Sequence, residues 1–324
     1  MNYVFDIKKK TFSWTKAMKF LKENGFVTIR NIFDKKFVEN ICNQCNEVLT
    51  KPSIMGSYGY YKKDIPKKLF DPLLIGGRIV DCFVNKKILE FVKKYLKGDF
   101  TLAECNLKFD AGIQLEYFPF HKDFSNGWNL RIHKKDNIKL NKEDMKSPLG
   151  VGGMIYLHDT DQGAFCYCAK SHNFNVDRGT ALSKYPRNER NEILKKMVKV
   201  LGKKGDLILF DDRGFHGPEQ PSKKNRTVLI FDYYKSNKFG ARTKMKIPVF
   251  LNDLGHLTKD QLKVLGLGKG YMIPHENYHT RGFNKTRKYK LLVKIINVFY
   301  GIDFLRLKIR LLLSALKRKA LLRH

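Results

Sequence analysis

Residues 205–231 read GDLILFDDRGFHGPEQPSKKNRTVLIF and carry the most informative pattern in the chain. Gly205 opens a turn into the apolar run Leu207 to Phe210, which is typical of a buried strand. A second apolar run follows Arg226, ten residues after His216. The stretch therefore predicts two buried strands, with a histidine between them and an arginine at the start of the second.

Short apolar runs of the same kind continue through the middle of the chain. They are separated by Gly, Asp and Lys clusters, and they comprise Gln114 to Phe120, Gly153 to His158, Phe165 to Cys168, Asp206 to Phe210 and Thr227 to Tyr234. This rhythm predicts a sandwich or barrel of antiparallel strands. Two stretches interrupt it. Residues 124–150 are polar and long enough for a functional loop, and Glu189 to Val200 is typical of a short helix.

The first quarter of the chain is helical in pattern, with one short strand. A helix over Thr15 to Asn24 is expected to stop at Gly25, a residue type that favours helix C-termini. The alternation from Phe26 to Arg30 predicts a strand, and Asp34 is then a plausible N-cap for a second amphipathic helix.

The composition limits the class of protein. Of 324 residues, 43% are hydrophobic and 13% aromatic, so a mainly disordered protein is excluded. The 63 Lys and Arg against 31 Asp and Glu give a net charge of +32, which favours anionic partners. The six cysteines are too few for a disulfide-stapled scaffold. Cys42 and Cys45 have CxxC spacing but lie in the apolar stripe of the second helix, which indicates core thiols.

The C-terminal tail has a composition of its own. Residues 281–324 hold thirteen Lys or Arg against one acid, Asp303, and apolar residues recur at helical spacing from Leu292 to Ala320. Such a helix is typical of an interfacial membrane helix, and equally of a terminal helix packed on the domain. No run is long enough for a signal peptide or a membrane span. We therefore expect a cytoplasmic protein, either free or peripheral at a membrane, with a main domain over 1–240, a connector over 241–285 and a basic amphipathic tail over 286–324.

A histidine and an aspartate stand two residues apart in the middle of the chain. His121 and Asp123 follow an expected strand, where residues i and i+2 project to the same face, so both can bind one ion. Alone, this spacing is more often a surface histidine near an acid. With His216, two histidines and one carboxylate form the ligand set of non-haem Fe(II) oxygenases. A guanidinium near such a site would hold the far carboxylate of a chelated keto acid.

The order of these motifs resembles the phytanoyl-coenzyme A dioxygenase family of Fe(II)- and 2-oxoglutarate-dependent oxygenases over about residues 15–235. The series runs through the helix, glycine and strand of residues 20–33, His121-Lys122-Asp123, the strand and turn of residues 154–165, Ala169-Lys170-Ser171-His172, the Gly205 strand, His216 and Arg226. Ala169-Lys170 stands where the family usually reads Pro-Gly, and Ala164 where it usually has proline. These departures concern turns, and the metal and co-substrate positions are intact.

The resemblance implies a mainly β (α+β) fold, a double-stranded β-helix or jelly-roll, cupin-like barrel with N-terminal helices and a C-terminal helical tail. It also implies that His121, Asp123 and His216 bind Fe(II), and that Arg226 binds the distal carboxylate of 2-oxoglutarate. Lys108 is the candidate for a second co-substrate contact, with Asn106 as the alternative. Because Asp123 is a carboxylate, where halogenating relatives have a small residue, halogenation is not expected.

The implied activity is hydroxylation by a dioxygenase domain over residues 1–240. 2-Oxoglutarate and O2 would yield succinate and CO2 while an unidentified small molecule is hydroxylated. Residues 51–70, rich in Lys and Tyr, and the Lys-rich residues 124–150 hint at an anionic substrate, and the tail at a lipid-linked one. The alternative is a non-catalytic basic protein on the same barrel that binds nucleic acid or an anionic membrane. Since the sequence shows no nucleic-acid-binding motif, nucleic acid is not expected as a partner.

Several other polar and aromatic residues have a structural and a functional interpretation. Arg213 is expected to be structural, paired with a neighbouring aspartate, and His158 and His172 are expected to be structural histidines. Three aromatic residues line either a substrate mouth or a lid or core: Trp128, Tyr60 and Tyr61.

Overall fold

The protein is described by a computed structural model. The residues it describes are 2–50, 57–58, 67–69, 72–110, 112, 119–127, 129–133, 136–174, 176–239, 247–250, 253–266 and 272–275, with the single residues 298, 305 and 309.

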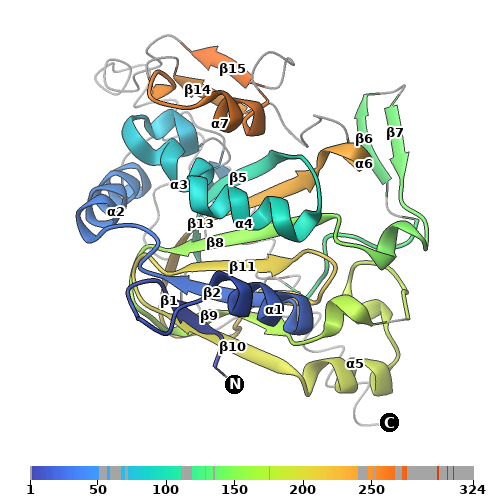
Figure 1. The fold of residues 1–324 in the computed structure, drawn as a ribbon. Helices are drawn as coiled ribbons and strands as arrows, with labels where there is room; N and C mark the ends of the chain where they lie inside the picture. Colours follow the sequence, from blue (N-terminus) through green and yellow to red (C-terminus); the bar gives the residue numbers. More distant parts are fainter. Residues whose placement is uncertain are drawn as a thin grey trace.

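Eight strands form the larger of two sheets (Figure 1). Their order across the sheet is β1 (Val4–Asp6), β2 (Phe26–Arg30), β11 (Leu207–Asp211), β8 (Gly150–Tyr156), β13 (Arg226–Lys235), β5 (Phe100–Asp110), β4 (Lys67–Leu69) and β3 (Ser57–Tyr58). All neighbours run antiparallel except β1 and β2, which are parallel. The smaller, antiparallel sheet has the order β10 (Met197–Gly202), β9 (Thr160–Cys168) and β12 (His216–Pro218).

The two sheets enclose an apolar layer. Phe26, Ile208 and Phe210 of the large sheet pack with Phe165 and Tyr167 of β9. Two mainly antiparallel sheets packed face to face in this way form a jelly roll. The predicted double-stranded β-helix is therefore confirmed.

Helices cover the opposite face of the large sheet, and Figure 1 shows α4 lying across its strands. They are α1 (Trp14–Asn24), α2 (Lys35–Thr50), α3 (Asp81–Val84) and α4 (Lys86–Leu96). Their apolar residues share the main core with Ile29, Leu209 and Leu229 of the sheet. Apolar side chains fill the contact between these helices and the sheet.

The ends of α1 follow from the sequence. The Ser13 hydroxyl accepts a hydrogen bond from the Lys16 amide at 3.3 Å, which caps the N-terminus. Gly25 takes the left-handed conformation, with φ 84°, and its amide donates to the Leu21 carbonyl at 2.7 Å. The predicted stop at Gly25 and the strand that follows are confirmed.

Helix α2 also begins as predicted. The Asp34 carboxylate accepts from the Phe37 amide at 2.8 Å, and Cys42 and Cys45 are buried free thiols. Burial raises the pKa of the Cys42 thiol to about 11. Both cysteines therefore behave as small core residues, as their position in the apolar stripe predicts.

The helix predicted over Glu189 to Val200 is too long. Helix α5 (Arg187–Leu194) ends early, and the next segment, β10, pairs antiparallel with β9. In β10, Val200 is buried and Lys199 is exposed, a period of two that fits a half-buried strand. Pairing to β9 overrides the helical pattern.

Other predicted strands and loops have different bounds in the structure. The strand expected over Gly153 to His158 is β8, which ends at Tyr156. The long segment expected over residues 124–150 contains β6 (Asn129–His133) and β7 (Asp136–Lys139), an antiparallel pair. Most of the strand expected over Gln114 to Phe120 lies outside the described residues.

The C-terminal third is described in part. After α6 (Ser236–Phe239), the strands β14 (Ile247–Phe250) and β15 (Met272–His275) form a parallel pair, and α7 (Lys259–Val264) lies between them in sequence. Val249 and Leu265 belong to the main core. The tail over 286–324 lies outside the described residues except for 298, 305 and 309. Among the residues described, no helix is long and apolar enough to cross a bilayer.

Candidate metal centre and its cavity

Three sequence-predicted residues meet at one end of the space between the sheets. One ligating atom from each of His121, Asp123 and His216 lies within 4.8 Å of the others. The Asp123 carboxylate is 3.8 Å from His121 Nε2 and 3.4 Å from His216 Nε2. Ligands at right angles around an ion, each about 2.1 Å from it, are about 3 Å apart. Small side-chain movements would therefore bring all three into a facial set.

The two histidines come from segments far apart in the chain that the fold joins directly. His121 and His216 form an isolated antiparallel bridge, in which each amide donates to the other residue's carbonyl at 3.0 and 2.8 Å. The Asp123 amide donates to the Asp212 carbonyl at 2.8 Å. Backbone hydrogen bonds thus fix the spacing of the triad.

The orientation of each imidazole is set by a carbonyl. His121 Nδ1 lies 3.1 Å from the Pro119 carbonyl, and His216 Nδ1 lies 3.0 Å from the Gly214 carbonyl. Because a carbonyl only accepts, each Nδ1 carries the proton. Both Nε2 atoms are then left with the lone pair that a metal ion needs, and the donor set fits a divalent ion.

Phe210 supports His216 from the large sheet, with ring centroids 4.7 Å apart. This position of the ring requires a glycine opposite it. A Cβ on Gly152 of β8 would lie only 2.2 Å from Phe210 Cζ. The glycine-rich start of β8 is therefore part of what places His216.

The turn between β11 and His216 is held by a buried ion pair. Arg213 donates to Asp211 through Nε at 2.9 Å and Nη2 at 2.7 Å, and the Tyr95 hydroxyl donates to Asp211 at 2.6 Å. Burial alone would raise the pKa of Asp211, but the charge and hydrogen bonds of Arg213 outweigh it and lower this pKa. The structural role predicted for Arg213 is confirmed.

His172 and His158 are satisfied by structural contacts. His172 Nε2 lies 3.0 Å from the Lys22 carbonyl, and burial lowers the pKa of His172. His158 Nε2 accepts from the Thr227 amide at 2.9 Å. Both contacts tie separate segments of the fold together, which is the structural role predicted for these residues.

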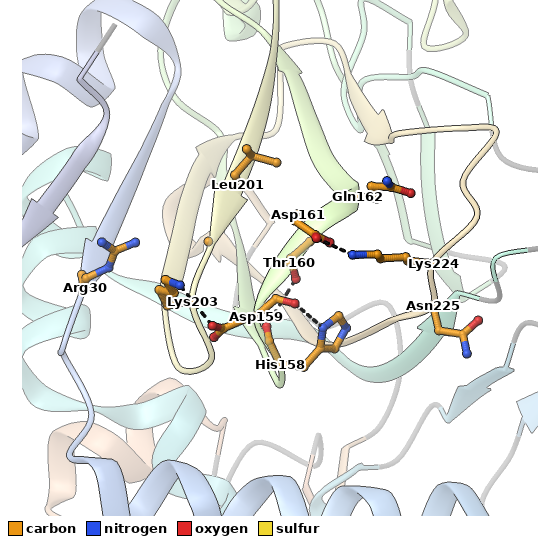
Figure 2. A pocket seen from close by; sticks show the side chains of 11 residues that line it. Arg30, His158, Asp159, Thr160, Asp161, Gln162, Leu201, Lys203, Lys224 and Asn225 are labelled. Carbon is orange, nitrogen blue, oxygen red and sulfur yellow. Dashed lines mark hydrogen bonds and ion pairs between the residues drawn. The ribbon is translucent and has the colours of Figure 1, made fainter.

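A surface hollow of about 510 Å³ lies beside His158. Figure 2 shows the side chains that line it, most of which are polar. Its acids already pair with lysines within it, Asp159 with Lys203 and Asp161 with Lys224. None of the triad residues lines it. The candidate metal ligands His121, Asp123 and His216 therefore line a different cavity.

That cavity, of about 270 Å³, opens beside the triad. Its apolar walls are Met154, Phe165, Phe210 and Ile230, and its polar lining beyond the triad is Glu104, Asn106, Lys108, Arg226 and Asp232. Apolar walls with a few convergent polar groups are typical of a small-molecule site.

The two predicted co-substrate residues lie together in this cavity. Arg226, only 1% exposed, donates through Nε to Asp110 at 3.0 Å and also through Nη2. Lys108 Nζ lies 3.1 Å from the other Asp110 oxygen. A guanidinium and an ammonium in one cavity are donor groups that suit the far carboxylate of a dicarboxylic keto acid.

The sequence matches one protein family over most of its length. The profile of phytanoyl-CoA dioxygenases matches residues 21–228, well over half of the chain and including the triad, Lys108 and Arg226. The chain belongs to this family.

Solved structures share the fold of this family member. The apo form of EctD from S. alaskensis has a TM-score of 0.54 at 14% identity, covering 73% of this chain and 82% of that one. EctD from S. alaskensis with 2-oxoglutarate and 5-hydroxyectoine has a TM-score of 0.53 at 14% identity, covering 69% and 76%. AviO1 from Streptomyces viridochromogenes Tue57 has a TM-score of 0.50 at 13% identity, covering 70% and 97%. None of the curated proteins matches the chain.

The departure from the family pattern before His172 has a structural outcome. Lys170 stands where the family usually has glycine, and it takes the left-handed conformation with φ 65°. Its amide still donates to the Asn24 carbonyl at 2.9 Å. The turn is therefore kept without glycine.

Sequence reasoning missed part of the cavity lining. Glu104 and Asp232 were not expected to take part in the site, and Asn106 only as an alternative to Lys108. Glu104, Asn106 and Lys108 do alternate along one strand, but that pattern does not reveal which face meets the metal. Trp128, Tyr60 and Tyr61 lie outside the described residues.

Proposed function

We propose that this chain is an Fe(II)- and 2-oxoglutarate-dependent dioxygenase that hydroxylates a small molecule. The observation that carries the proposal is the triad, whose two Nε2 atoms lie beside one carboxylate while both Nδ1 atoms bind backbone carbonyls. Membership of the phytanoyl-CoA dioxygenase family supports the reaction class. EctD structures with bound Fe and with 2-oxoglutarate support the choice of cofactor and co-substrate.

The residues of the cavity would have two separate binding roles. His121, Asp123 and His216 would hold Fe(II), and Lys108 and Arg226 would hold the distal carboxylate of 2-oxoglutarate. Fe(II) with 2-oxoglutarate supplies, when bound, the coupling of O2 reduction and keto-acid decarboxylation to hydroxylation of a C–H bond. Phe165, Phe210 and other apolar walls keep water away from the reacting atoms.

The finer predictions about substrate and location extend this proposal. Residues 51–70 and 124–150, which hint at an anionic substrate, lie partly outside the described residues. Described parts of the tail support a peripheral membrane role for a cytoplasmic enzyme, because the helical residues Val298, Leu305 and Ile309 are exposed. A lipid-linked substrate would follow from such a location.

An anaerobic titration of the metal-free protein with Fe(II) and 2-oxoglutarate tests the proposal. A chelated keto acid gives a visible charge-transfer band, which we expect in the wild type and not in His216→Ala. His256→Ala is the matched control, because His256 pairs with Asp81 away from the cavity.

The same titration has an outcome that contradicts the proposal. If well-folded wild-type protein gives no band, the triad does not assemble this cofactor pair. The alternative function, a basic protein that binds nucleic acid or anionic membranes without catalysis, would then be preferred. Its binding would weaken steeply with salt.

A further inference from the structure

A buried lysine stands between two of the proposed metal ligands. Lys122 is only 5% exposed, although lysine side chains are rarely buried in proteins. Neighbouring residues of an extended segment project to opposite sides, so Lys122 points away from the side that His121 and Asp123 share. Both ligands line the cavity, and Lys122 does not. The lysine therefore lies behind the metal centre, on the side away from the cavity.

The ammonium group of Lys122 has defined contacts. Its Nζ donates to Asp177 Oδ1 at 2.9 Å, and it lies 5.6 Å from the ring centre of Phe215 and 5.9 Å from that of Tyr185. The two rings pack edge to face, with centroids 5.1 Å apart. A carboxylate and aromatic rings are groups that attract a desolvated cation. Because Phe215 directly precedes His216, Lys122 is in contact with both segments that carry ligands.

Asp177 uses both of its carboxylate oxygens. Besides the contact with Lys122, Oδ1 accepts from the Gly179 amide at 3.1 Å, and Oδ2 accepts from the Asn126 amide at 2.6 Å. Lys122 and Asn126 stand on either side of Asp123 in the sequence. The Asp177 carboxylate therefore holds the ligand segment at two points, one before and one after Asp123.

Backbone hydrogen bonds hold the same segment along its edges. On one edge the Lys122 amide donates to the Thr180 carbonyl at 3.0 Å, and the Leu182 amide donates to the Phe120 carbonyl at 3.1 Å. The other edge carries the bridge to His216. Such bonds lie in the plane of the paired segments and set their register. Side chains project out of that plane, so movement toward or away from the ion needs a further restraint.

A buried ion pair supplies that kind of restraint. As a means of stabilising a fold it is inefficient, because apolar residues of similar volume are often equally stable. What the pair adds is a fixed geometry, since the ammonium group must meet its carboxylate. The triad requires fixed geometry, because the Asp123 carboxylate lies 3.8 and 3.4 Å from the two Nε2 atoms and a functional site tolerates errors of only about 0.5 Å.

We propose that Lys122 and Asp177 form an ion-pair clamp that positions His121 and Asp123 for a divalent metal ion. Neither member of the clamp lines the cavity, so both are positioning residues. This inference rests on the proposed function and extends its metal site to two further residues. Without the clamp, His121 and Asp123 would lose their alignment together, because Lys122 lies between them.

The first test removes the charge from the lysine. Lys122→Met keeps most of the buried stem and lacks the ammonium group. Fe(II) affinity is measured anaerobically from the charge-transfer band at saturating 2-oxoglutarate. We expect the dissociation constant of Fe(II) to rise about tenfold or more, because groups that orient metal ligands typically change metal affinity about 10- to 100-fold.

Arg178→Met is the matched control. It removes the neighbouring ion pair with Glu189, which lies one residue from the clamp and is more exposed. This variant should keep the Fe(II) affinity of the wild type.

Urea unfolding of the metal-free proteins separates positioning from a merely structural role. A pair that only stabilises the fold would lower the free energy of unfolding in Lys122→Met and leave the Fe(II) affinity of the folded protein at the wild-type value. That result would overturn the proposal, because a clamp must change the affinity of molecules that are folded.

Asp177→Asn tests the clamp from its other end, and it does not depend on whether Lys122→Met folds. The substitution keeps the size of the side chain and removes its charge. It should also weaken Fe(II) binding, and the double variant should bind no more weakly than the weaker single variant. Unchanged Fe(II) affinity in Asp177→Asn, or losses that multiply in the double variant, would contradict the pairing.

The band of the wild type distinguishes this proposal from the one on which it rests. A wild type that gives no band with Fe(II) and 2-oxoglutarate would contradict the proposed function. A wild type that gives the band, with an Fe(II) affinity that both substitutions leave unchanged, would contradict only the clamp.

Discussion

Each imidazole of the metal centre is oriented by a carbonyl two residues earlier in its own segment, Pro119 for His121 and Gly214 for His216. No other side chain is needed to select the tautomer. Replacement of one ligand should therefore leave the other two in place. The consequence at the residue scale is that ligand and co-substrate functions can be tested one side chain at a time.

The first residue-scale prediction separates Lys108 from Asn106. Lys108→Met should weaken 2-oxoglutarate binding about tenfold or more, because a hydrogen bond to a charged group contributes about 1.5–3 kcal/mol. Asn106→Leu should leave it nearly unchanged, since the Asn106 amide nitrogen is directed to Glu104. The dissociation constant of 2-oxoglutarate, taken from the charge-transfer titration, measures the effect of each substitution. Lys93→Met is the surface control, and equal losses in Lys108→Met and Asn106→Leu would contradict the assignment.

The second residue-scale prediction concerns His172 and pH. Burial lowers the pKa of His172 from its usual 6.5, so below that pH the unfolded chain binds more protons than the folded one. The stability contributed by neutral His172 should be complete above pH 6.5 and be lost as the pH falls through the window below it. Urea unfolding should show that, as the pH falls through this range, the free energy of unfolding declines less steeply for His172→Gln than for the wild type.

The matched control for that prediction is His256→Gln, which changes an exposed histidine paired with Asp81. It should not reproduce the effect of His172→Gln on the slope of stability against pH. Parallel declines for the wild type and His172→Gln would mean that other groups carry the pH dependence.

At the scale of elements, the junction of α1 and β2 leads to a third prediction. Gly25 has φ 84°, and a Cβ there would lie 2.4 Å from Tyr167 Oη and 2.5 Å from His172 Nδ1. Gly127 has a similar φ of 77° but open space around it. Gly127→Ala should lose about 1–2 kcal/mol of unfolding free energy from the backbone alone, and Gly25→Ala about 1–3 kcal/mol more from crowding.

Denaturant unfolding of the two alanine variants measures this difference. The comparison isolates side-chain crowding, because both glycines have a positive φ of similar size. Equal losses of unfolding free energy in Gly25→Ala and Gly127→Ala would show that β9 and His172 move aside at no cost. The junction of α1 and β2 would then not be tightly packed.

The elements also show which features local sequence can predict. Gly25, Asp34 and the apolar runs at Leu207 and Thr227 carry turn chemistry and periodicity within a few residues, and the predicted elements formed there. Residues 197–200 were wrongly predicted as helix, because what makes them a strand is pairing with β9, which lies about thirty residues earlier in the chain.

The same distinction, between local sequence patterns and long-range strand pairing, applies to the candidate site. His121, Asp123, His216 and Arg226 were found because their spacing matches a known order of motifs. Glu104 and Asp232 were missed because they come from β5 and β13, and only the register of those strands places the two residues opposite each other. Pairing between distant segments is a property of the folded sheet and leaves no local pattern.

At the scale of the whole molecule, the uneven charge leads to a fourth prediction. The tail over 286–324 is strongly basic, and its described residues Val298, Leu305 and Ile309 are 62%, 58% and 48% exposed. Their spacing places Leu305 and Ile309 on one helix face. A protein lacking residues 286–324 should lose binding to phosphatidylserine vesicles in a sedimentation assay and keep 2-oxoglutarate turnover.

Two controls make that experiment decisive. Vesicles of neutral lipid should bind neither form, since attraction to anionic headgroups is part of the expected affinity. Circular dichroism must show that the shortened chain keeps its β structure. Undiminished vesicle binding after the deletion would assign the membrane affinity to the main domain.

The backbone bridge between His121 and His216 also bears on how the protein acquires its ion during synthesis. On the ribosome, His121 and Asp123 emerge long before His216, so the nascent chain offers only two of the three ligands. Two ligands hold an ion weakly. If a strong site formed early, copper or zinc would outcompete iron for it. Because the third ligand arrives with β12, after most strands of both sheets, tight binding would begin only late in synthesis, and the fold itself would delay the choice of metal.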